Sequence, residues 1–364
     1  MRLRATRSED DPGTAAHPRA DRRSWLNAAD KNLEREEAMN RWTRFAVAFA
    51  ASATLLAGGG AAPGQDYPNR PIRIVVPTAP GGMSDIVSRT FAAKVQERTG
   101  RIVVVENRTG ANGVIAADHV AKSAPDGYTI YLGFHGTNSV LQHLDPKLPY
   151  NPAKDFAPVV FLVTGPTVLV VHPSVPAKSV QELIALAKSK PGGLTYASAG
   201  IGTTPHLVAE QFKLHTGVQI VGVQYRGAAP ANQDVLAGHV PMTFDLIGNA
   251  MNNIREGKFR ALGITAAQRS PLLPDVPTMQ EAGLPQMEAG AWFAFFAPAG
   301  TPRAAIDWLN REANAIFTAP DVSARFTAAG MSIPLGSPER LGAHVEADTK
   351  RWGEVIRRAG IKLN

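Results

Sequence analysis

The chain has 364 residues, of which 44% are hydrophobic and 19% charged, a globular composition long enough for two ordinary α/β domains. It contains no cysteine, which excludes disulfides, thiolate nucleophiles, zinc–thiolate sites and a lipid-anchoring cysteine. The formal net charge is +7, but the basic residues do not cluster, so we expect no nucleic-acid partner and a mildly basic protein suited to anionic ligands.

The N-terminal region reads as a secretory signal at residues 39–64. Two arginines precede an uncharged, mainly apolar run, Phe45 to Leu56, and small residues follow it. A run of this length is shorter than the about 20 residues that span a bilayer, and small residues suit a signal peptidase. We therefore expect a cleaved signal, a mature chain that begins near Gln65, and a soluble product outside the cytoplasm.

Residues 1–38 precede that signal and carry mixed charge without apolar periodicity. A signal peptide starts close to the initiator methionine, so Met39 is the favoured start and 1–38 is expected to be a disordered, non-native extension. Arg22-Arg23 resembles a twin-arginine signal, but no apolar region follows it, and this alternative is disfavoured.

The first part of the mature chain alternates apolar and amphipathic segments. In chain order, the pattern predicts a strand at 71–77, a helix at 84–100, a strand at 101–108, a helix at 113–124 and a strand at 128–133. This rhythm is typical of parallel sheets with helices on both faces. Ligands of such sheets bind at the carboxyl ends of the strands, so the loops that follow the strands are the candidate sites.

A second unit follows with the same alternation. Strands are predicted at 168–171 and 194–198, with a helix that begins at Ser179 between them, and the alternation continues from residue 206 to residue 265. A proline-rich linker at 268–286 precedes an aromatic strand from Trp292 and a long helix near Pro302. Two further helices are expected to close the chain.

The loop PTAPGGMSD follows the first predicted strand. It lacks the spacing of a phosphate-binding P-loop or of a dinucleotide loop, so nucleotide binding is disfavoured. Gly81 and Gly82 allow the backbone to approach a ligand, and Ser84 or Asp85 can cap the next helix, whose positive end favours a carboxylate. The alternative is a tight turn with a helix cap and no ligand.

A second loop, YASAGIGTTPHL, places hydroxyls and exposed amides before a helix that contains His206. Directed N–H and O–H donors at a helix terminus hold an anion without a formal positive charge. The candidates here are Ser198, Ala199, Gly200, Gly202, Thr203 and Thr204, and a purely structural loop is the alternative.

Two more strand ends carry candidates. In LGFHGTNSV, Gly133, Gly136, Thr137 and Asn138 are expected to line a cleft, and His135 is either a ligand contact or a structurally satisfied histidine. In PMTFDLIGN, Asp245 could accept from an ammonium group, position water, or cap the next turn.

An enzyme built from Ser198, His206 and Asp245 is disfavoured, because no G-x-S-x-G elbow surrounds the serine and the histidine lies too close to it in sequence. The nine histidines form neither HExxH nor a cluster, so we expect no metal and no cofactor.

Eight segments in order resemble the tripartite tricarboxylate transporter substrate-binding receptors, also called the Bug family, from about Tyr67 to Lys362. They are PIRIVVPTAPGGMSDIVSR, VVVENRTGANG, APDGYTIYLG, LPYNPAKDFAPV, YASAGIGTTPHL, VQYRGAAPANQDVLAGHV, RSPLLPDVPTMQEAGLP and WFAFFAPAGTP.

The resemblance implies a non-enzymatic receptor in the periplasm of a Gram-negative bacterium. Its fold would be the two-lobed, type II-like periplasmic binding protein fold, or Venus flytrap, each lobe an α/β unit with a mainly parallel sheet. Residues 66–166 and 290–364 would form lobe 1, and residues 167–289, with the return linker, lobe 2. The receptor would be a monomer that closes on a small organic acid or related solute and presents it to the membrane subunits of the transporter.

The same resemblance implies which residues hold the ligand. Backbone amides and small hydroxyls of two loops, one from Ala79 and Pro80 through Met83 to Asp85 and one from Ser198 to His206, would contact it. Further cleft positions match Gly133 to Asn138, Tyr225, Gly227 and Asp245. Met83 stands where smaller residues are common, and the FHGTN segment also departs from the usual pattern.

Two alternative functions are considered. The same binding protein could serve a sensor kinase instead of a transporter, and the sequence does not distinguish these two roles. A secreted serine hydrolase is disfavoured for the reasons given above.

Overall fold

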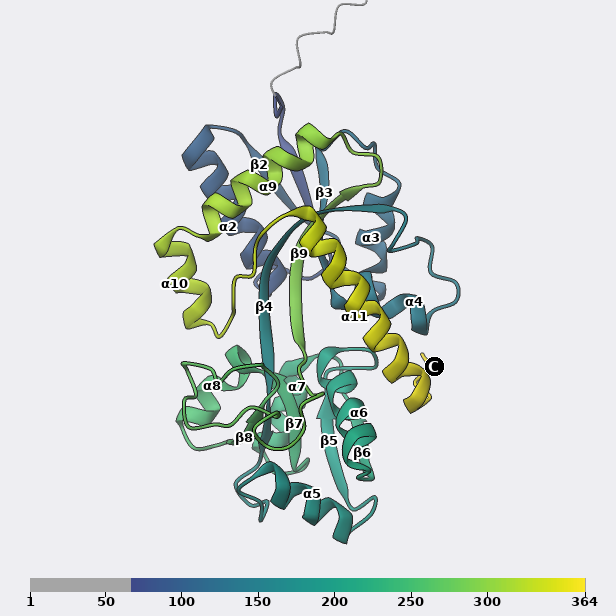
Figure 1. The fold of residues 1–364 in the computed structure, drawn as a ribbon, viewed down its shortest axis with the longest axis vertical. Coiled ribbons are helices and arrows are strands. Elements are labelled where there is room, and N and C mark those ends of the chain that lie inside the picture. Colours follow the sequence, from purple (N-terminus) through teal and green to yellow (C-terminus); the bar gives the residue numbers. More distant parts are fainter. Residues whose placement is uncertain (1–66, 364) are drawn as a thin grey trace, which may run out of the picture. The chain divides into compact units, whose positions relative to one another are not determined.

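The computed structural model describes residues 67–363, so the predicted extension at 1–38 and the predicted signal at 39–64 lie outside the described part. Figure 1 labels its helices and strands. In chain order the elements are β1 (Ile72–Val76), α2 (Met83–Thr99), β2 (Val103–Asn107), η1 (Ala111–Gly113), α3 (Val114–Ala121), β3 (Thr129–Phe134), η2 (Gly136–Val140), α4 (Leu141–Leu144), β4 (Phe156–Val171), α5 (Val180–Ser189), β5 (Leu194–Ser198), α6 (Thr204–Thr216), β6 (Ile220–Gln224), α7 (Ala228–Leu236), β7 (Met242–Leu246), α8 (Ile247–Arg255), β8 (Arg260–Ile264), β9 (Gly290–Pro298), α9 (Arg303–Phe317), α10 (Pro320–Ala328) and α11 (Pro338–Ala359).

The strands of the described part join in the order β2-β1-β3-β9-β4-β7-β5-β6, with β8 paired to β4. The outer pairs β1–β2, β1–β3, β5–β6 and β5–β7 are parallel, as βαβ crossovers require. The pairs that involve β4 or β9 are antiparallel. Each end of the sheet is therefore a parallel α/β unit, and two long antiparallel strands connect them.

Strands β4 and β9 are the connection between the two ends of the sheet. β4 pairs with β9 from Phe156 to Pro166 and then with β7 and β8 from Thr167 to Val171. Figure 1 shows the two strands side by side in the middle of the sheet. A single strand thus leaves one half of the sheet and enters the other.

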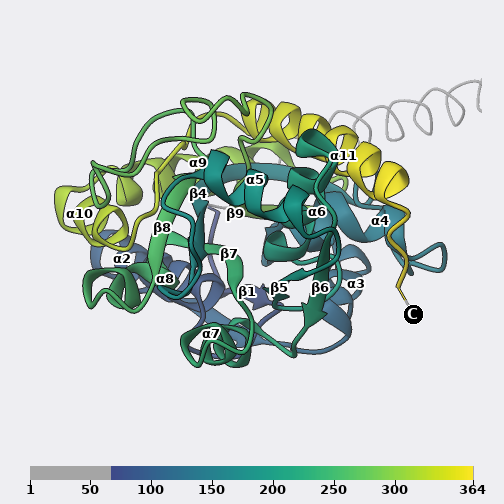
Figure 2. The same ribbon diagram turned by 90° about the horizontal axis from the view of Figure 1, so that it is seen from below.

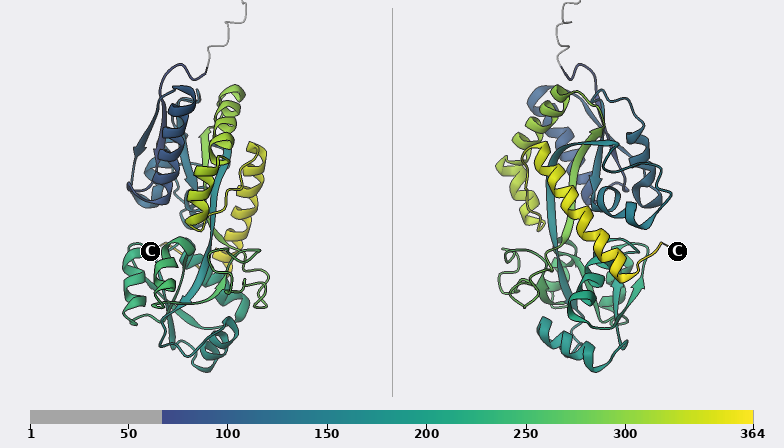
Figure 3. Two further views of the ribbon diagram at one scale, coloured as in Figure 1. Left: turned by 90° about the vertical axis from the view of Figure 1, so that its left-hand side faces the viewer. Right: turned by 45° about the vertical axis from the view of Figure 1, so that its right-hand side comes forward.

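Four buried apolar clusters lie between the sheet and its helices. Side chains of β1, β3 and β9 alternate between two of them: Ile72, Ile74 and Val76 pack with α2 and α9, whereas Val75 packs with α3. At the other end of the sheet, α5 and α6 cover one face and α7 and α8 the other, as Figure 2 shows. The left view of Figure 3 likewise shows helices on both sides of β4. The strands are buried on both faces, which explains their continuous apolar sequences.

Local signals in the sequence set the helix ends. The Ser179 side chain accepts a hydrogen bond from the backbone N–H of Glu182 and begins α5, and Ser337 does the same for α11 with Pro338 in the first turn. Gly217 and Gly360 end α6 and α11 in the left-handed conformation.

The predicted strand–helix alternation is confirmed, including the two helices after the long one. The predicted strand at 168–171 is the last part of β4, which begins twelve residues earlier, at Phe156. Register shifts near Pro158 and Phe161 interrupt the regular pairing of this longer strand with β9. No helix within residues 67–363 is both long and apolar enough to cross a membrane.

The close approach of β4 and β9 yields a first prediction. A Cβ atom at Gly290 would lie 2.4 Å from the Gly165 carbonyl oxygen, a backbone atom that cannot swing away. Gly290→Ala should therefore lower the free energy of unfolding by about 1–3 kcal/mol, as overpacked sites do. Urea unfolding of the two proteins measures this difference.

Gly342→Ala is the matched control. A Cβ there meets only Pro158 Cγ at 3.6 Å, inside α11, so alanine should stabilise the helix by up to about 1 kcal/mol. Equal stabilities of the two variants would contradict the argument.

Candidate functional site

A cavity of about 360 Å³ lies where the loops that follow β1, β2, β3 and β5 meet the end of β7 and the start of α8. Its walls include Ser84, His135, Thr204 and Asp245, which come from four loops that the sequence singled out. The other predicted residues that line it are Gly136, Ala199, Gly202 and Thr203. The cavity has the size and the placement at strand ends that small-molecule sites favour.

In the first loop, Ser84 lines the cavity, and Asp85 organises the loop behind it. Asp85 is 3% exposed and accepts hydrogen bonds from Gly81 N at 3.0 Å, Arg89 Nε at 2.9 Å and Asn107 Nδ2 at 3.0 Å. Burial alone would raise the pKa of Asp85, but these donors outweigh it and lower the pKa below its ordinary value. Asp85, in the first turn of α2, thus ties the preceding loop to Arg89 and Asn107.

The remaining predicted residues of this loop do not line the cavity. Ala79, Pro80, Gly81 and Gly82 are exposed to solvent, and Met83 is half-buried against the core cluster under α2. A ligand role for these five residues stays a prediction.

The second loop brings the amino end of α6 to the cavity, through Thr203, Thr204 and Pro205. The first turn of α6 contains no acidic residue. The N–H groups of Thr204 and His206 have no acceptor four residues back within the helix, and the helix dipole makes this end positive. The first turn of α2 contains Asp85, whereas the first turn of α6 contains no carboxylate.

Gly202 allows this loop to pass close to its neighbour. It adopts φ = +77°, and a Cβ there would lie 2.8 Å from Leu144 Cδ1 of α4. Its N–H donates to His206 Nδ1 at 3.2 Å, and the Ser198 hydroxyl donates to the Gly200 carbonyl at 3.2 Å. Ser198, Gly200 and His206 therefore shape the loop from behind the cavity wall.

In the third loop, His135 is 6% exposed and lines the cavity. Its Nε2 lies 2.8 Å from Thr204 Oγ1, whereas its Nδ1 is buried without a hydrogen-bond partner. Burial lowers the pKa of His135 to about 4, so the imidazole is neutral at neutral pH. The pair links the loop after β3 to the amino end of α6.

Gly133, Thr137 and Asn138 lie behind that wall. Thr137 Oγ1 is 2.8 Å from both Tyr131 Oη and Asn138 Oδ1, and a Cβ at Gly133 would lie 2.4 Å from the same Asn138 oxygen. These residues hold η2 in place and do not line the cavity.

In the fourth loop, Asp245 is 2% exposed and lines the cavity. Its carboxylate accepts from Asn232 Nδ2 at 2.5 Å, Asn249 Nδ2 at 3.0 Å and Leu246 N at 2.8 Å. Burial raises the pKa of Asp245 above its ordinary value despite these donors. Besides His135, it is the one acidic or basic side chain among the described residues that lines this cavity.

Tyr225 and Gly227 support the second loop without lining the cavity. Tyr225 N donates to the Ser198 carbonyl at 2.8 Å, and Gly227 N donates to the Ala199 carbonyl at 3.1 Å. Ala228, the next residue, does line it.

Several lining residues were missed by the sequence reasoning. Gly110, Asn112 and Gly113 follow β2, and glycines directly after a strand were the available signal. Phe134, Leu141, Ile201, Leu246 and Phe293 also line it, but an apolar residue that faces a cavity has the same sequence signature as one that faces the core.

The hydrolase alternative finds no support in the geometry. Ser198, His206 and Asp245 bond to Gly200, Gly202 and the Asn232–Asn249 pair, so each side chain is engaged away from the other two. Within residues 67–363, no group of three or more His, Asp or Glu side chains is arranged to hold a metal ion.

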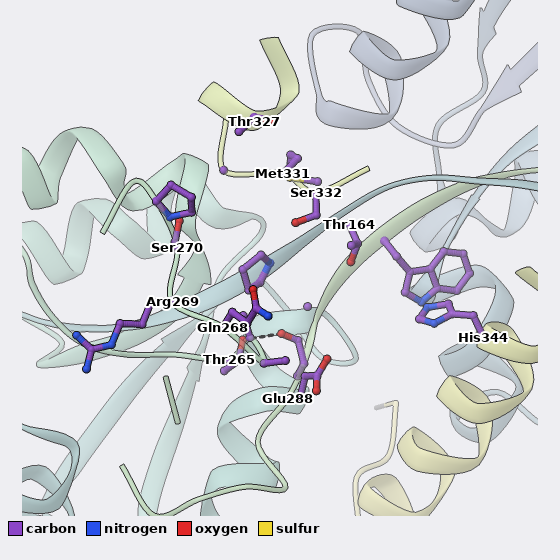
Figure 4. Close-up of a pocket in the computed structure, with 18 of the residues that line it drawn as sticks. Thr164, Thr265, Gln268, Arg269, Ser270, Glu288, Thr327, Met331, Ser332 and His344 are labelled. Carbon is purple, nitrogen blue, oxygen red and sulfur yellow. Dashed lines mark hydrogen bonds between the residues drawn. The ribbon is translucent and has the colours of Figure 1, made fainter. Parts of the chain in front are cut away.

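A second, larger cavity of about 560 Å³ lies on the other face of β9, which we call the hinge-side cavity. Gly290 and Trp292 line it, whereas Ala291 and Phe293 line the first cavity, because successive strand residues face opposite sides. Figure 4 shows Thr164, Ser332 and His344 around it. Its arginines, Arg269 and Arg351, already pair with Glu281 and Asp348, so the cavity at the strand ends is the better solute site.

Known proteins share this architecture and sequence. Residues 87–361 match the family model described as "Tripartite tricarboxylate transporter family receptor". Protein BugT of Bordetella pertussis is 39% identical over 298 residues, which are 82% of this chain and 91% of BugT.

Solved structures agree with this match. A protein of R. palustris solved with adipate is 37% identical, with a TM-score of 0.74 over 82% of this chain and all of that one. MatC from Rhodopseudomonas palustris, with bound malate, is 37% identical, with a TM-score of 0.70 over 80% of this chain and all of MatC. The periplasmic binding protein BugD is 34% identical, with a TM-score of 0.70 over 82% of this chain and all of BugD.

The predicted α/β periplasmic binding protein fold is therefore confirmed. The prediction that the chain is a solute-binding receptor, and not an enzyme, is confirmed as well. The chain belongs to the tripartite tricarboxylate transporter receptor family, also called the Bug family.

Proposed function

We propose that this receptor works in the periplasm, captures a small carboxylate-type solute between two lobes, and delivers it to the membrane subunits of a tripartite tricarboxylate-type transporter. Lobe 1 would comprise residues 66–166 and 290–364, and lobe 2 residues 167–289. The observation that carries the proposal is the cavity at the strand ends, whose lining residues come from both of these ranges.

The chemistry of the cavity suits a carboxylate. The amino end of α6 offers N–H groups without an acidic competitor in its first turn, and Thr203 and Thr204 at this end line the cavity. The relatives solved with adipate and with malate hold carboxylic acids, which supports the same ligand class here.

In this proposal, the two lobes close because of the contacts that the solute makes. A solute that touches both His135 and the amino end of α6 gains all its contacts only when the two ranges are close, so it shifts the population towards the closed form. The 2.8 Å contact between His135 Nε2 and Thr204 Oγ1 joins the two ranges directly and supports this proposal.

A thermal-shift screen of organic acids against the purified protein tests the proposal. An acid present at about 100 times its Kd should add about 2.7 kcal/mol to the free energy of unfolding, because it binds only the folded state. If no organic acid raises the melting temperature, the proposed ligand class is wrong.

The variant Thr204→Val tests the site. It leaves His135 Nε2 buried without a partner, so we expect affinity to fall about tenfold, equivalent to about 1.4 kcal/mol. Thr318→Val, at the exposed end of α9, is the control and should bind like the original protein. Delivery is tested by uptake of the labelled acid in cells with and without the membrane subunits.

A further inference from the structure

The two cavities lie on opposite faces of the strands that connect the ends of the sheet. Ala291 and Phe293 of β9 border the cavity at the strand ends, whereas Gly290 and Trp292 border the hinge-side cavity. β9 pairs with β4, and β4 changes its pairing partner at Thr167. The paired strands therefore separate the two cavities at the place where the chain passes from one half of the sheet to the other.

The walls of the hinge-side cavity come from both ranges that we propose as lobes. Thr164, Thr327 and Ser332 belong to the range of lobe 1. Gln268 and Arg269 belong to the range of lobe 2. Figure 4 shows these five side chains around the cavity. A space of about 560 Å³ lies between the walls, so the two ranges do not pack tightly against each other here.

The crossing strands provide a fixed point between the two cavities. A Cβ atom at Gly290 would lie 2.4 Å from the Gly165 carbonyl oxygen, so the backbones of β9 and β4 already touch there. Packed backbones resist compression. A rotation of the lobes about this point that brings the walls of one cavity together must therefore move the walls of the other apart. Closure over a solute at the strand ends widens the hinge-side cavity, and opening narrows it.

We propose that the hinge-side cavity sets the balance between the open and closed forms, so that the size of the side chains in its walls determines solute affinity without contact to the solute. The inference rests on the proposed function, since it takes closure at the strand ends as the binding step. A side chain that fills the hinge-side cavity resists its narrowing and disfavours the open form. The apparent Kd is the intrinsic Kd divided by the fraction of closed protein, so such a side chain raises the affinity.

Two tryptophan variants, one in each wall, test the inference. Ser332 and Gln268 line the cavity and are exposed, so Ser332→Trp and Gln268→Trp add an indole there without displacing a core side chain. Calorimetric titrations with adipate and with malate should show each variant binding at least about threefold tighter than the original protein. Ser189→Trp is the matched control, because Ser189 is exposed at the end of α5 and lies outside the lining of both cavities. It should bind like the original protein.

A measurement without ligand separates this inference from the proposed function. Small-angle X-ray scattering should give unliganded Ser332→Trp and Gln268→Trp a smaller radius of gyration than the original protein and Ser189→Trp, because the two variants are more often closed. If the radius shrinks but no organic acid binds any of these proteins, the role of the hinge-side cavity stands and the proposed ligand class is wrong.

Circular dichroism first identifies which tryptophan variants are folded, and either cavity variant suffices for the test. In a folded cavity variant, an unchanged or larger radius of gyration would overturn the inference. An unchanged or lower affinity for an acid that the original protein binds would overturn it too. An equal gain of affinity in Ser189→Trp would also reject it, since an added surface indole would then explain the effect.

Discussion

Asp348→Ala should lower the free energy of unfolding by about 3 kcal/mol, because it removes the partner of a buried indole and of an arginine. Asp348 of α11 is 3% exposed and accepts from Trp292 Nε1 of β9 at 2.8 Å and from Arg351 Nη2 at 2.5 Å. Trp292 is 1% exposed, so its N–H would lose its acceptor without gaining water. The Arg351 side chain is 33% exposed and can reach solvent, so the indole accounts for most of the loss.

Two variants separate this effect from ordinary loss of a surface charge. Asp348→Asn keeps an oxygen acceptor for Trp292 and should cost clearly less than alanine. Asp307→Ala removes a carboxylate that pairs with Arg303 on the surface of α9, and should change the stability by less than about 1 kcal/mol. Urea unfolding measures the free energy of unfolding of all three variants, provided that their m-values are equal. If Asp348→Ala lowers this free energy no more than Asp307→Ala does, the role of the indole contact is refuted.

Acid should destabilise the protein through His135 by about 3 kcal/mol between pH 7 and pH 4. Burial lowers the pKa of His135 in the folded protein from 6.5 to about 4, whereas the unfolded chain keeps the ordinary value. Between these two pKa values the unfolded state binds a proton that the folded state does not. The stability contributed by the neutral imidazole is therefore complete above pH 6.5 and falls as the pH drops towards 4.

The comparison with His135→Gln isolates this contribution, because other buried groups titrate in both proteins. Asp245, whose pKa is raised by burial, contributes to the pH dependence of stability with the opposite sign. We expect the stability advantage of the original protein over the variant to shrink by about 3 kcal/mol from pH 7 to pH 4. Parallel stability curves would contradict the neutral, buried state of His135.

The elements of the fold were predictable because apolar periodicity is a local property of the sequence. The helices with marked starts, such as the one at Ser179, and the parallel strands with continuous apolar runs were located well. The full length of β4 was not, since Pro158, Gly165 and Pro166 resemble an interruption. The structure accommodates them through register shifts and a change of pairing partner at Thr167, which are properties of the sheet and not of the segment.

The site was predictable only at the level of loops. Four strand-end loops were identified, and each contributes at least one residue to the cavity. Which residue faces inward depends on the helices and strands that meet there. Met83 illustrates the limit, because its position in PGGMSD suggests a ligand contact while its half-buried side chain packs against the core beneath α2, so that its ligand role stays a prediction. Ala291 and Phe293 illustrate the converse, since an aromatic strand gives no sign that one of its faces lines a cavity.

The alternation of β9 has a practical consequence. Ala291 and Phe293 border the proposed solute site, while Trp292 between them faces the hinge-side cavity and lies against His344. An intrinsic fluorophore is thus built into the strand that borders the solute, yet its ring points away from the solute. Once the other four tryptophans are replaced, the fluorescence emission of Trp292 reports movement of β9. An aromatic acid in the proposed site would not quench this emission by direct contact.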